Sequence, residues 1–389
     1  MDLRFSDDDE RFRAEVRAWL EARLDGEYRN LRGRGGPGRE HEAIEPRMAW
    51  ERELGAAGWI GLGWPAPHGR GASLWRQVIF HEEYARARAP GRFGHIGEYL
   101  LGPTIAALGT PEQKNMFLPA IARGEQMWCQ GYSEPGAGSD LAGVSTRATL
   151  DGGDWRIDGQ KIWTSHAHLS DWCFVIARTD PHEKRHAGLS YLLVPMRQPG
   201  ITVRPIKNLT GTAEFCEVFF DGARTAVDNI VGVPGDGWRV AMATLAFERG
   251  ASTLGQQIGF AAELDAIIAA AKQRGADRDP ELRRRLADAW IGLRVMRAYA
   301  LRVLAHGERG ELSPAGLGAK LYWSNWHRRL GELAMEVLGP DAELIAAAPY
   351  ALTQLQEIFL FSRADTIYAG SNEIQRNIIA ARALGLPRG

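Results

Sequence analysis

Cysteine is scarce in this sequence, and long hydrophobic runs are missing. The three cysteines, Cys129, Cys173 and Cys216, stand alone in apolar stretches of a 389-residue chain, without CxxC spacing. An odd number of isolated cysteines argues against a disulfide framework, so we expect buried thiols and a cytoplasmic protein. No run approaches the roughly 18 apolar residues of a membrane-spanning helix, and the acidic first ten residues lack the apolar core of a signal peptide. We therefore expect no membrane partner.

Excess charge of one sign is also absent. Lys and Arg together number 47 and Asp and Glu 48, which gives a net charge of −1. No overall field therefore draws nucleic acid to the protein, and we expect no nucleic-acid partner. An anionic ligand must instead be held by a local site.

The glycine-rich segment 131–140 contains neither a P-loop nor a dinucleotide-binding fingerprint. Residues 131–140, Gly-Tyr-Ser-Glu-Pro-Gly-Ala-Gly-Ser-Asp, are rich in small side chains that let backbone N–H groups approach a ligand. No Gly-Lys-Ser/Thr follows, and Leu141 stands where the third Gly of a dinucleotide fingerprint belongs. From spacing alone, a plain turn is the simpler interpretation. No cluster of carboxylates or cysteines supports a metal pair at His166 and His168, so we expect no metal site.

The hydrophobic period changes twice along the chain. Ser6 is the expected N-cap of a first helix, and the glycine-rich stretch 33–38 is expected to form a flexible surface loop. From about residue 128 the pattern favours strands, with a hairpin over 155–162 that turns at Asp158-Gly159. The other expected strands are 172–177, 189–194, 201–206 and 214–220.

Helical spacing returns after residue 235. One helix is expected over 238–274, and the next has Asp279 as N-cap and Pro280 at its first position. The sequence therefore predicts an α+β protein in which a helical part, a compact β-barrel or sandwich and a helical bundle follow one another. The expected domains are 1–125, 126–232 and 233–389.

Four segments together resemble the acyl-CoA dehydrogenase family in order and spacing. They are 131–140, 159–165 (Gly-Gln-Lys-Ile-Trp-Thr-Ser), 245–249 (Leu-Ala-Phe-Glu-Arg) and 367–377 (Ile-Tyr-Ala-Gly-Ser-Asn-Glu-Ile-Gln-Arg-Asn). The resemblance implies an FAD-dependent oxidoreductase that converts an acyl-CoA thioester to the trans-2-enoyl-CoA. Fatty-acid or steroid side-chain degradation is the implied setting.

The resemblance also implies roles for single residues. Tyr132 and Ser133 are expected at the pyrimidine edge of the flavin, and Ser139 at the pyrophosphate or the thioester arm. Trp163 is expected to cover one face of the ring, unless it is an ordinary core residue, and Ser165 to donate to flavin N5. The other implied cofactor-binding residues are Gln130, Gly138, Thr164, Arg274, Gly370, Ser371 and Glu373, and the implied substrate contacts are Ser139, Arg249 and Tyr368. Residues 372–376 fit a capping turn before the last helix as well.

The catalytic base is expected on a helix. The family's reaction removes a weakly acidic α-proton, which requires a carboxylate whose pKa is raised in a dry cavity. Many members carry this base as Glu in a Tyr-Glu-Gly triplet, but the triplet here is Tyr368-Ala369-Gly370. Glu248 matches the Glu-Arg pair of isovaleryl-CoA and long-chain members and is the expected base, the alternative being an exposed helical carboxylate. The run 240–247 is apolar all round, so its helix is expected to be buried. Ala369 is left to donate its backbone N–H to the thioester oxygen.

Departures from the family pattern bear on assembly. Residues 273–277 and 336–340 lack the Phe-Gly and Gln of the family's cross-subunit FAD site, although Arg274 remains to pair with the pyrophosphate. This resembles bacterial members that act on bulky CoA thioesters, some of them heterotetramers with incomplete FAD sites. We expect a homo- or hetero-oligomer, dimer or tetramer, and an electron-transfer flavoprotein as electron acceptor. Gly94 and Gly97 favour a roomy acyl pocket.

Two other functions stay open on the same fold. One is a non-catalytic partner subunit of a heteromeric acyl-CoA dehydrogenase. The other is a flavin oxidase or monooxygenase, since the access of oxygen to the flavin depends on cavity shape.

Overall fold

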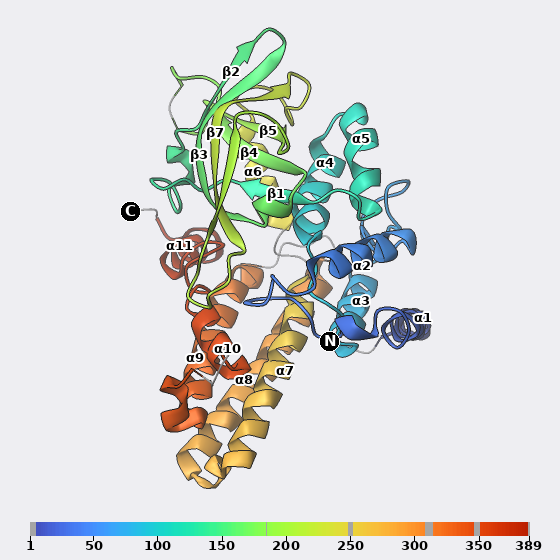
Figure 1. Ribbon diagram of the computed structural model, residues 1–389, viewed down its shortest axis with the longest axis vertical. Coiled ribbons are helices and arrows are strands. Elements are labelled where there is room, and N and C mark those ends of the chain that lie inside the picture. The colour runs from blue at the N-terminus through green and yellow to red at the C-terminus, as the bar shows by residue number, and fades with distance from the viewer. Residues whose placement is uncertain (1–4, 184, 248–251, 308–313, 346–350, 388–389) are drawn as a thin grey trace. The chain divides into compact units, whose positions relative to one another are not determined.

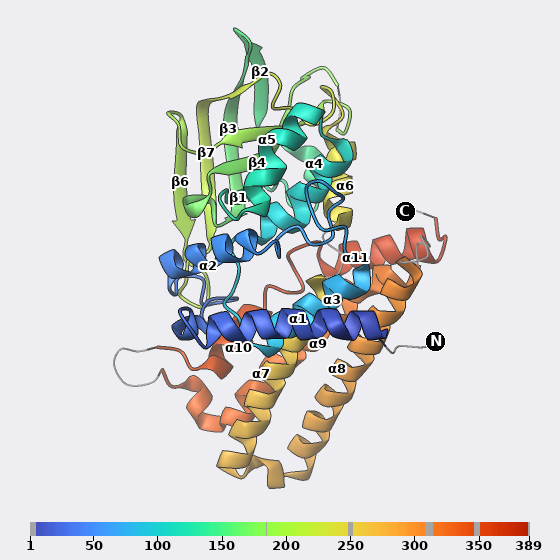
Figure 2. The ribbon, with the colours of Figure 1, turned by 90° about the vertical axis from the view of Figure 1, so that its right-hand side faces the viewer.

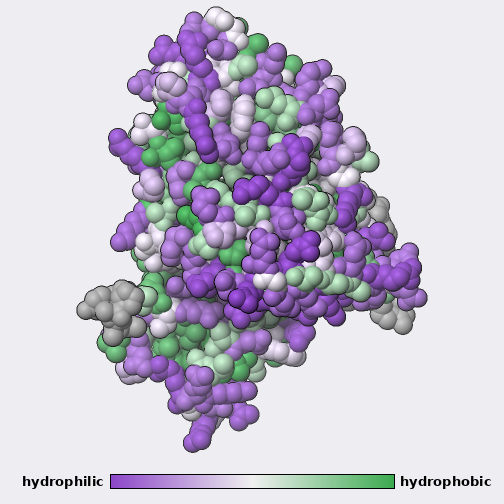
Figure 3. Space-filling model, turned by 45° about the vertical axis from the view of Figure 1, so that its right-hand side comes forward, coloured by the Kyte–Doolittle hydropathy of each residue, from purple (hydrophilic) through white to green (hydrophobic). Residues whose placement is uncertain are grey.

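Helices occupy both ends of the chain and strands its middle, so the predicted α+β class is confirmed (Figure 1). The computed structural model describes residues 5–183, 185–247, 252–307, 314–345 and 351–387. No helix within these ranges is both long and apolar enough to cross a bilayer. The face seen in Figure 3 is largely hydrophilic, with hydrophobic residues in scattered groups.

The chain folds into two compact units, each assembled from stretches that are separate in sequence. The first, here called the helix unit, comprises residues 1–22, 73–88 and 251–389. The second, the sheet unit, comprises residues 23–72 and 89–250.

The helix unit is built around four helices of the C-terminal part, which pack on one core. That core includes Phe260, Leu264, Trp326 and Leu330. The helices of the unit are α1 (Asp7–Leu24, up to residue 22), α3 (Leu74–Arg86), α7 (Ser252–Arg274), α8 (Pro280–Gly307), α9 (Ala319–Leu338), α10 (Gln354–Ser362) and α11 (Asn372–Ile378).

Helix boundaries in this unit follow the predicted caps. The Ser6 hydroxyl accepts a hydrogen bond from Asp9 N at 3.2 Å, at the start of α1. The Asp279 carboxylate accepts from Glu281 N at 2.8 Å, and Pro280 opens α8. Both side chains satisfy N–H groups that the first turn of a helix leaves unpaired.

The sheet unit holds one seven-stranded sheet whose strand order is β1-β4-β2-β3-β7-β6, with β5 paired to β4. Neighbouring strands are antiparallel except at β1–β4 and β2–β4. The strands are β1 (Trp128–Gly131), β2 (Arg147–Asp151), β3 (Asp154–Ser165), β4 (Trp172–Arg178), β5 (Leu189–Pro195), β6 (Ile201–Ile206) and β7 (Phe215–Ala226). The sheet curls into a half-barrel, as Figure 2 shows from the side.

Both faces of this sheet are covered, and strand alternation explains how. On β4, Phe174 and Ile176 belong to the core shared with the helices, whereas Cys173 and Val175 point to the opposite core. The helical side is formed by α4 (Gly102–Leu108), α5 (Pro111–Ala122) and α6 (Gly237–Phe247), and α2 (Ile44–Ala56) completes the unit. The three cysteines are free and buried, as predicted.

The predicted hairpin turn at Asp158-Gly159 is wrong. Residues 154–165 form one continuous strand, and the chain reverses at Gly152-Gly153 instead. Asp158-Gly159 is a bulge against β7, where Gly159 has φ 151° and the Asp158 carboxylate accepts from Gly222 N at 2.8 Å. Gly at a bulge and Gly in a hairpin turn give the same sequence signal.

The predicted long helix over 238–274 appears as two described helices, α6 and α7, with residues 248–251 outside the described ranges. The expectation that 240–247 is buried all round is wrong at its end. Val240 and Thr244 are buried, whereas Ala246 and Phe247 are exposed.

Candidate active site

A buried ion pair between Glu134 and Lys161 fixes the first predicted segment, residues 131–140. The Glu134 carboxylate accepts from Lys161 Nζ at 2.8 Å, from Ser145 N at 2.7 Å and from Thr146 N at 2.9 Å. Burial alone would raise the pKa of Glu134, but the Lys161 ammonium and these donors outweigh it and lower the pKa to about 2. The carboxylate is therefore ionised and fully used in holding the loop.

The same lysine joins the first two predicted segments. Lys161 Nζ also donates to the carbonyl of Tyr132 at 3.0 Å, and Ile162 N donates to the carbonyl of Ser133 at 2.9 Å. Burial lowers the pKa of Lys161, and the charge of Glu134 offsets part of that shift. Glu134 and Lys161 both lie within the motif segments 131–140 and 159–165, but nothing local in the sequence indicates that they pair.

The outer side of the loop is open. Gly136, Gly138 and Ser139 are exposed, and a Cβ placed on either glycine would meet no atom within 4 Å. Ala137 between them is buried and bonded to the backbone of Glu134. A rigid turn with bare, accessible backbone on one side suits the close approach of a ligand.

Trp163 departs from the alternating burial pattern of β3. It is 56% exposed and adopts a left-handed backbone, φ 59°, at an irregularity where β3 loses register with β7. A core tryptophan is therefore excluded. At this irregularity the large flat side chain of Trp163 is exposed where strand alternation would bury it. Bulges of this kind are frequent beside active sites.

The two residues after Trp163 end strand β3. Thr164 is fully buried, and its hydroxyl has no hydrogen-bond partner among the described residues. Ser165 is half-buried and pairs with Phe215 of β7, while Gln130 of β1 pairs with Phe174 of β4. The Thr164 hydroxyl is thus a buried polar group without a described partner, next in sequence to an exposed aromatic ring.

Five predicted residues of the helix unit, Tyr368, Ala369, Gly370, Ser371 and Glu373, lie in one short stretch of the chain. Ala369 and Gly370 both have positive φ, at 50° and 88°. Gln375 donates from Nε2 to the Ala369 carbonyl at 3.1 Å. Ser371 caps α11, accepting from Ile374 N, whereas the capping turn was expected within 372–376, which here form the first turns of the helix. The Glu373 side chain is 75% exposed on the first turn of α11.

Arg274 has partners within its own unit. Its guanidinium donates to the Leu338 carbonyl at 3.0 Å and pairs with Asp341 at 2.7 Å. A phosphate partner would therefore compete with Asp341.

Two predicted residues, Glu248 and Arg249, lie outside the described residues. The described helix that precedes them in the sequence, α6, is anchored by buried hydroxyls. Thr244 of α6, four residues before Glu248 in the sequence, accepts a hydrogen bond from Thr104 at 2.9 Å and donates to the Val240 carbonyl.

The expectation of room at Gly94 and Gly97 is wrong. A Cβ on Gly94 would stand 2.9 Å from the Glu51 carboxylate, and one on Gly97 would stand 3.2 Å from Trp128. Glycine is needed there because neighbouring side chains fill the space, so these positions give no information on acyl-chain size.

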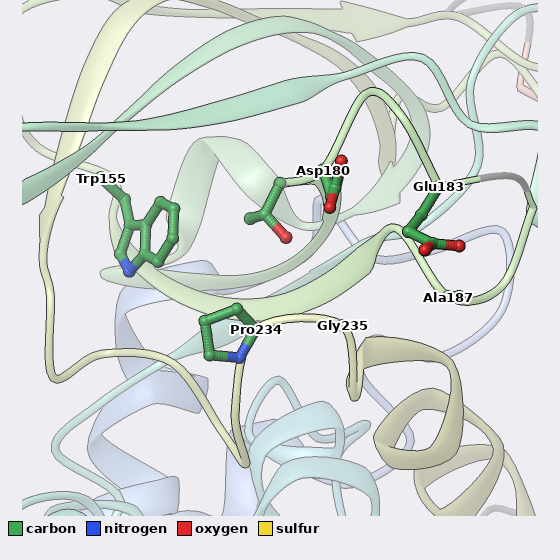
Figure 4. A pocket seen from close by; sticks show the side chains of 7 residues that line it. Trp155, Asp180, Glu183, Ala187, Pro234 and Gly235 are labelled. Atoms are coloured by element: carbon green, nitrogen blue, oxygen red, sulfur yellow. The ribbon is translucent and has the colours of Figure 1, made fainter.

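A separate hollow lies on the sheet unit, with a volume of about 390 Å³ (Figure 4). Its lining includes the carboxylates of Asp180 and Glu183, which disfavour a phosphorylated ligand. None of the predicted site residues lines it.

The chain was compared with known proteins. Family models for the N-terminal, middle and C-terminal domains of acyl-CoA dehydrogenases match residues 6–125, 129–223 and 235–384. The acyl-CoA dehydrogenase IpdE1 of Mycobacterium tuberculosis is 59% identical over 98% of both chains. The chain belongs to the acyl-CoA dehydrogenase family.

Solved structures agree with this assignment. A structure named Tcur3481-Tcur3483 steroid ACAD superimposes with a TM-score of 0.86 at 32% identity and covers 100% of both chains. The ChsE4-ChsE5 complex of Mycobacterium tuberculosis gives 0.81 at 29% identity, again with 100% of both chains covered. The protein is thus an acyl-CoA dehydrogenase family enzyme with the three-part fold of that family.

Proposed function

We propose that this acyl-CoA dehydrogenase oxidises the Cα–Cβ bond of a bulky acyl-CoA thioester, with FAD as the hydride acceptor and Glu248 as the base. The observation that carries the proposal is Trp163, an exposed aromatic ring on a strained backbone beside the unpartnered Thr164 hydroxyl. Left-handed backbone at a non-glycine residue is costly and tends to persist where function requires it.

The residues present fit FAD. Trp163 offers a flat face for a planar ring, Ser165 a hydroxyl beside it, and the 136–139 turn an open backbone for polar oxygens. The Glu134–Lys161 ion pair joins the strand that carries Trp163 and Ser165 to the loop that contains residues 136–139. When bound, FAD supplies the acceptor for the β-hydride. The chain itself has only to orient the ring and to exclude water from it.

Proton abstraction is assigned to Glu248 because the alternative position carries no acid. Ala369, in the triplet where many relatives place the base, has a methyl side chain that accepts no proton. Its backbone N–H, carried on a left-handed turn, is suited to donate to the thioester oxygen as charge develops there. The chain then divides the work: a carboxylate on one segment removes the α-proton, and an N–H on another stabilises the enolate.

The substrate class and partners rest on relatives. The structural relative named as a steroid ACAD supports a bulky, steroid-derived acyl group. Relatives solved as two-component complexes support an oligomer with more than one kind of subunit. An electron-transfer flavoprotein is the proposed electron acceptor.

The test is anaerobic mixing of the purified protein with a panel of acyl-CoA thioesters. We expect a yellow protein that releases FAD on denaturation, and bleaching of its flavin by acyl-CoAs with bulky chains. A protein that binds FAD but is bleached by no acyl-CoA, alone or with a partner subunit, would be a non-catalytic subunit. Rapid reoxidation by air with stoichiometric peroxide would instead indicate an oxidase.

A further inference from the structure

A buried charge network in the helix unit ends on the Tyr368–Gly370 turn. At its centre is His327 of α9, which is 4% exposed and has a carboxylate at each ring nitrogen. Nδ1 lies 2.5 Å from the Asp365 carboxylate and Nε2 lies 2.6 Å from that of Glu263 on α7. Because carboxylates only accept hydrogen bonds, both ring nitrogens must donate, and the ring is an imidazolium.

The surroundings support this charge state. Burial lowers the pKa of His327, but the hydrogen bonds that the ring donates to Asp365 and Glu263 outweigh it and raise the pKa to about 9. Phe260 stacks on the imidazole with ring centroids 4.3 Å apart, which fixes its plane. Lys320 adds a second positive charge at the edge of the network, where its ammonium donates to the backbone carbonyl of Asp365.

The second oxygen of Asp365 reaches the turn. Asp365 Oδ1 accepts from the Tyr368 hydroxyl at 2.8 Å, and the Lys320 ammonium stands 5.2 Å from the centre of the Tyr368 ring. Tyr368 is 38% exposed, so packing alone does not fix it. One carboxylate thus joins a buried cation to the residue that precedes the strained Ala369.

We propose that His327 is a positioning residue that acts through Asp365 to hold the Tyr368–Gly370 turn in its left-handed conformation. The proposal rests on the proposed function, in which Ala369 N–H donates to the thioester. A neutral side chain at position 327 would leave Asp365 free to rotate away from Tyr368. The turn would then sample conformations in which the Ala369 N–H no longer faces the oxygen.

The experiment compares the wild-type chain with His327→Gln, Tyr368→Phe and the double variant. Hydrogen exchange of the peptide spanning 366–371 and the rate of flavin reduction by a verified acyl-CoA are both measured. We expect His327→Gln to speed exchange about tenfold and to slow reduction about tenfold, with little change in substrate affinity. The double variant should be no worse than the more affected single variant, because both residues act through Asp365.

Glu83→Gln is the matched control for a merely structural effect. Glu83 is also buried in the helix unit, where it pairs with Arg13, Arg17 and Arg86. We expect this variant to lose stability while exchange at 366–371 and the reduction rate of the folded protein stay at wild-type values.

The outcomes separate the two proposals. Unchanged exchange and reduction in His327→Gln, or additive losses in the double variant, would overturn the positioning role while an active wild type keeps the proposed function. If the wild type is reduced by no acyl-CoA, the proposed function fails. In that case exchange alone decides whether His327 holds the turn.

Discussion

The two units hold their site segments with opposite arrangements of charge. In the sheet unit one buried carboxylate, Glu134, is surrounded by donors that include the Lys161 ammonium. In the helix unit one buried cation, His327, is surrounded by two carboxylates. The first fixes the open loop beside Trp163, and the second, by our proposal, fixes the Tyr368–Gly370 turn.

This difference predicts how the Glu134 and His327 networks respond to mutation and to pH. Glu134 is satisfied by several donors, two of them backbone N–H groups that no mutation of a partner removes. His327 depends on two side-chain carboxylates alone for its polar contacts among the described residues. A buried charge that loses its partner is expensive, so the two networks differ in which variant breaks them and at which pH they fail.

The largest effect is expected from Lys161→Met. This change leaves Glu134 buried without its counter-ion, and breaking a buried pair from one side costs about 3–5 kcal/mol. We expect the free energy of unfolding to fall by that amount in a denaturant titration, and FAD to be lost with it.

The control for this variant is the double change Lys161→Met with Glu134→Gln, which removes both charges. Its stability should recover towards that of the wild type. A single Lys161→Met variant that stays within about 1 kcal/mol of the wild type and keeps its FAD would contradict the anchoring role of the pair.

A smaller effect is expected from pH, with opposite signs for the two networks. The pKa of His327 is raised from 6.5 to about 9, so the stability it contributes is complete below pH 6.5 and lost as the pH rises through 9. The pKa of Glu134 is lowered from 4.5 to about 2, so its contribution is complete above pH 4.5 and lost as the pH falls through 2.

Thermal unfolding tests the loss of stability that is expected as His327 deprotonates at alkaline pH. Between pH 6.5 and 9.5 the melting temperature of His327→Gln should fall less than that of the wild type. Equal pH dependence of the two proteins would show that His327 is not the titrating group.

Much of the fold was predictable because helix caps and strand alternation are local signals. Asp279-Pro280 marked the start of α8, and the strand over 201–206 was predicted with its observed bounds. Asp158-Gly159 misled because a bulge and a hairpin turn use the same residues. The stretch 33–38, expected to be flexible, is partly buried, and Gly35 packs against Arg47, whose position depends on tertiary contacts.

The site was less predictable than the fold. Motif resemblance pointed to Trp163 and to the 368–370 triplet, and Trp163, Ala369 and Gly370 have left-handed backbone. Nothing local links His327 to Asp365, which lie 38 residues apart and meet only through the packing of the bundle. Pairings of this kind depend on tertiary structure and leave no periodic signal in the sequence.

The identity of the base is the central claim, and the rate of anaerobic flavin reduction in Glu248→Gln tests it most directly. Glutamine keeps the size and hydrogen bonding of the side chain but accepts no proton, so reduction should slow by at least about a hundredfold. FAD content and ligand affinity should stay close to those of the wild type, as should all properties of Glu281→Gln, which removes an exposed helical carboxylate. Adding Ala369→Glu to Glu248→Gln should restore part of the rate. If Glu248→Gln is reduced as fast as the wild type by a verified substrate, the base is another residue and the proposed mechanism is wrong.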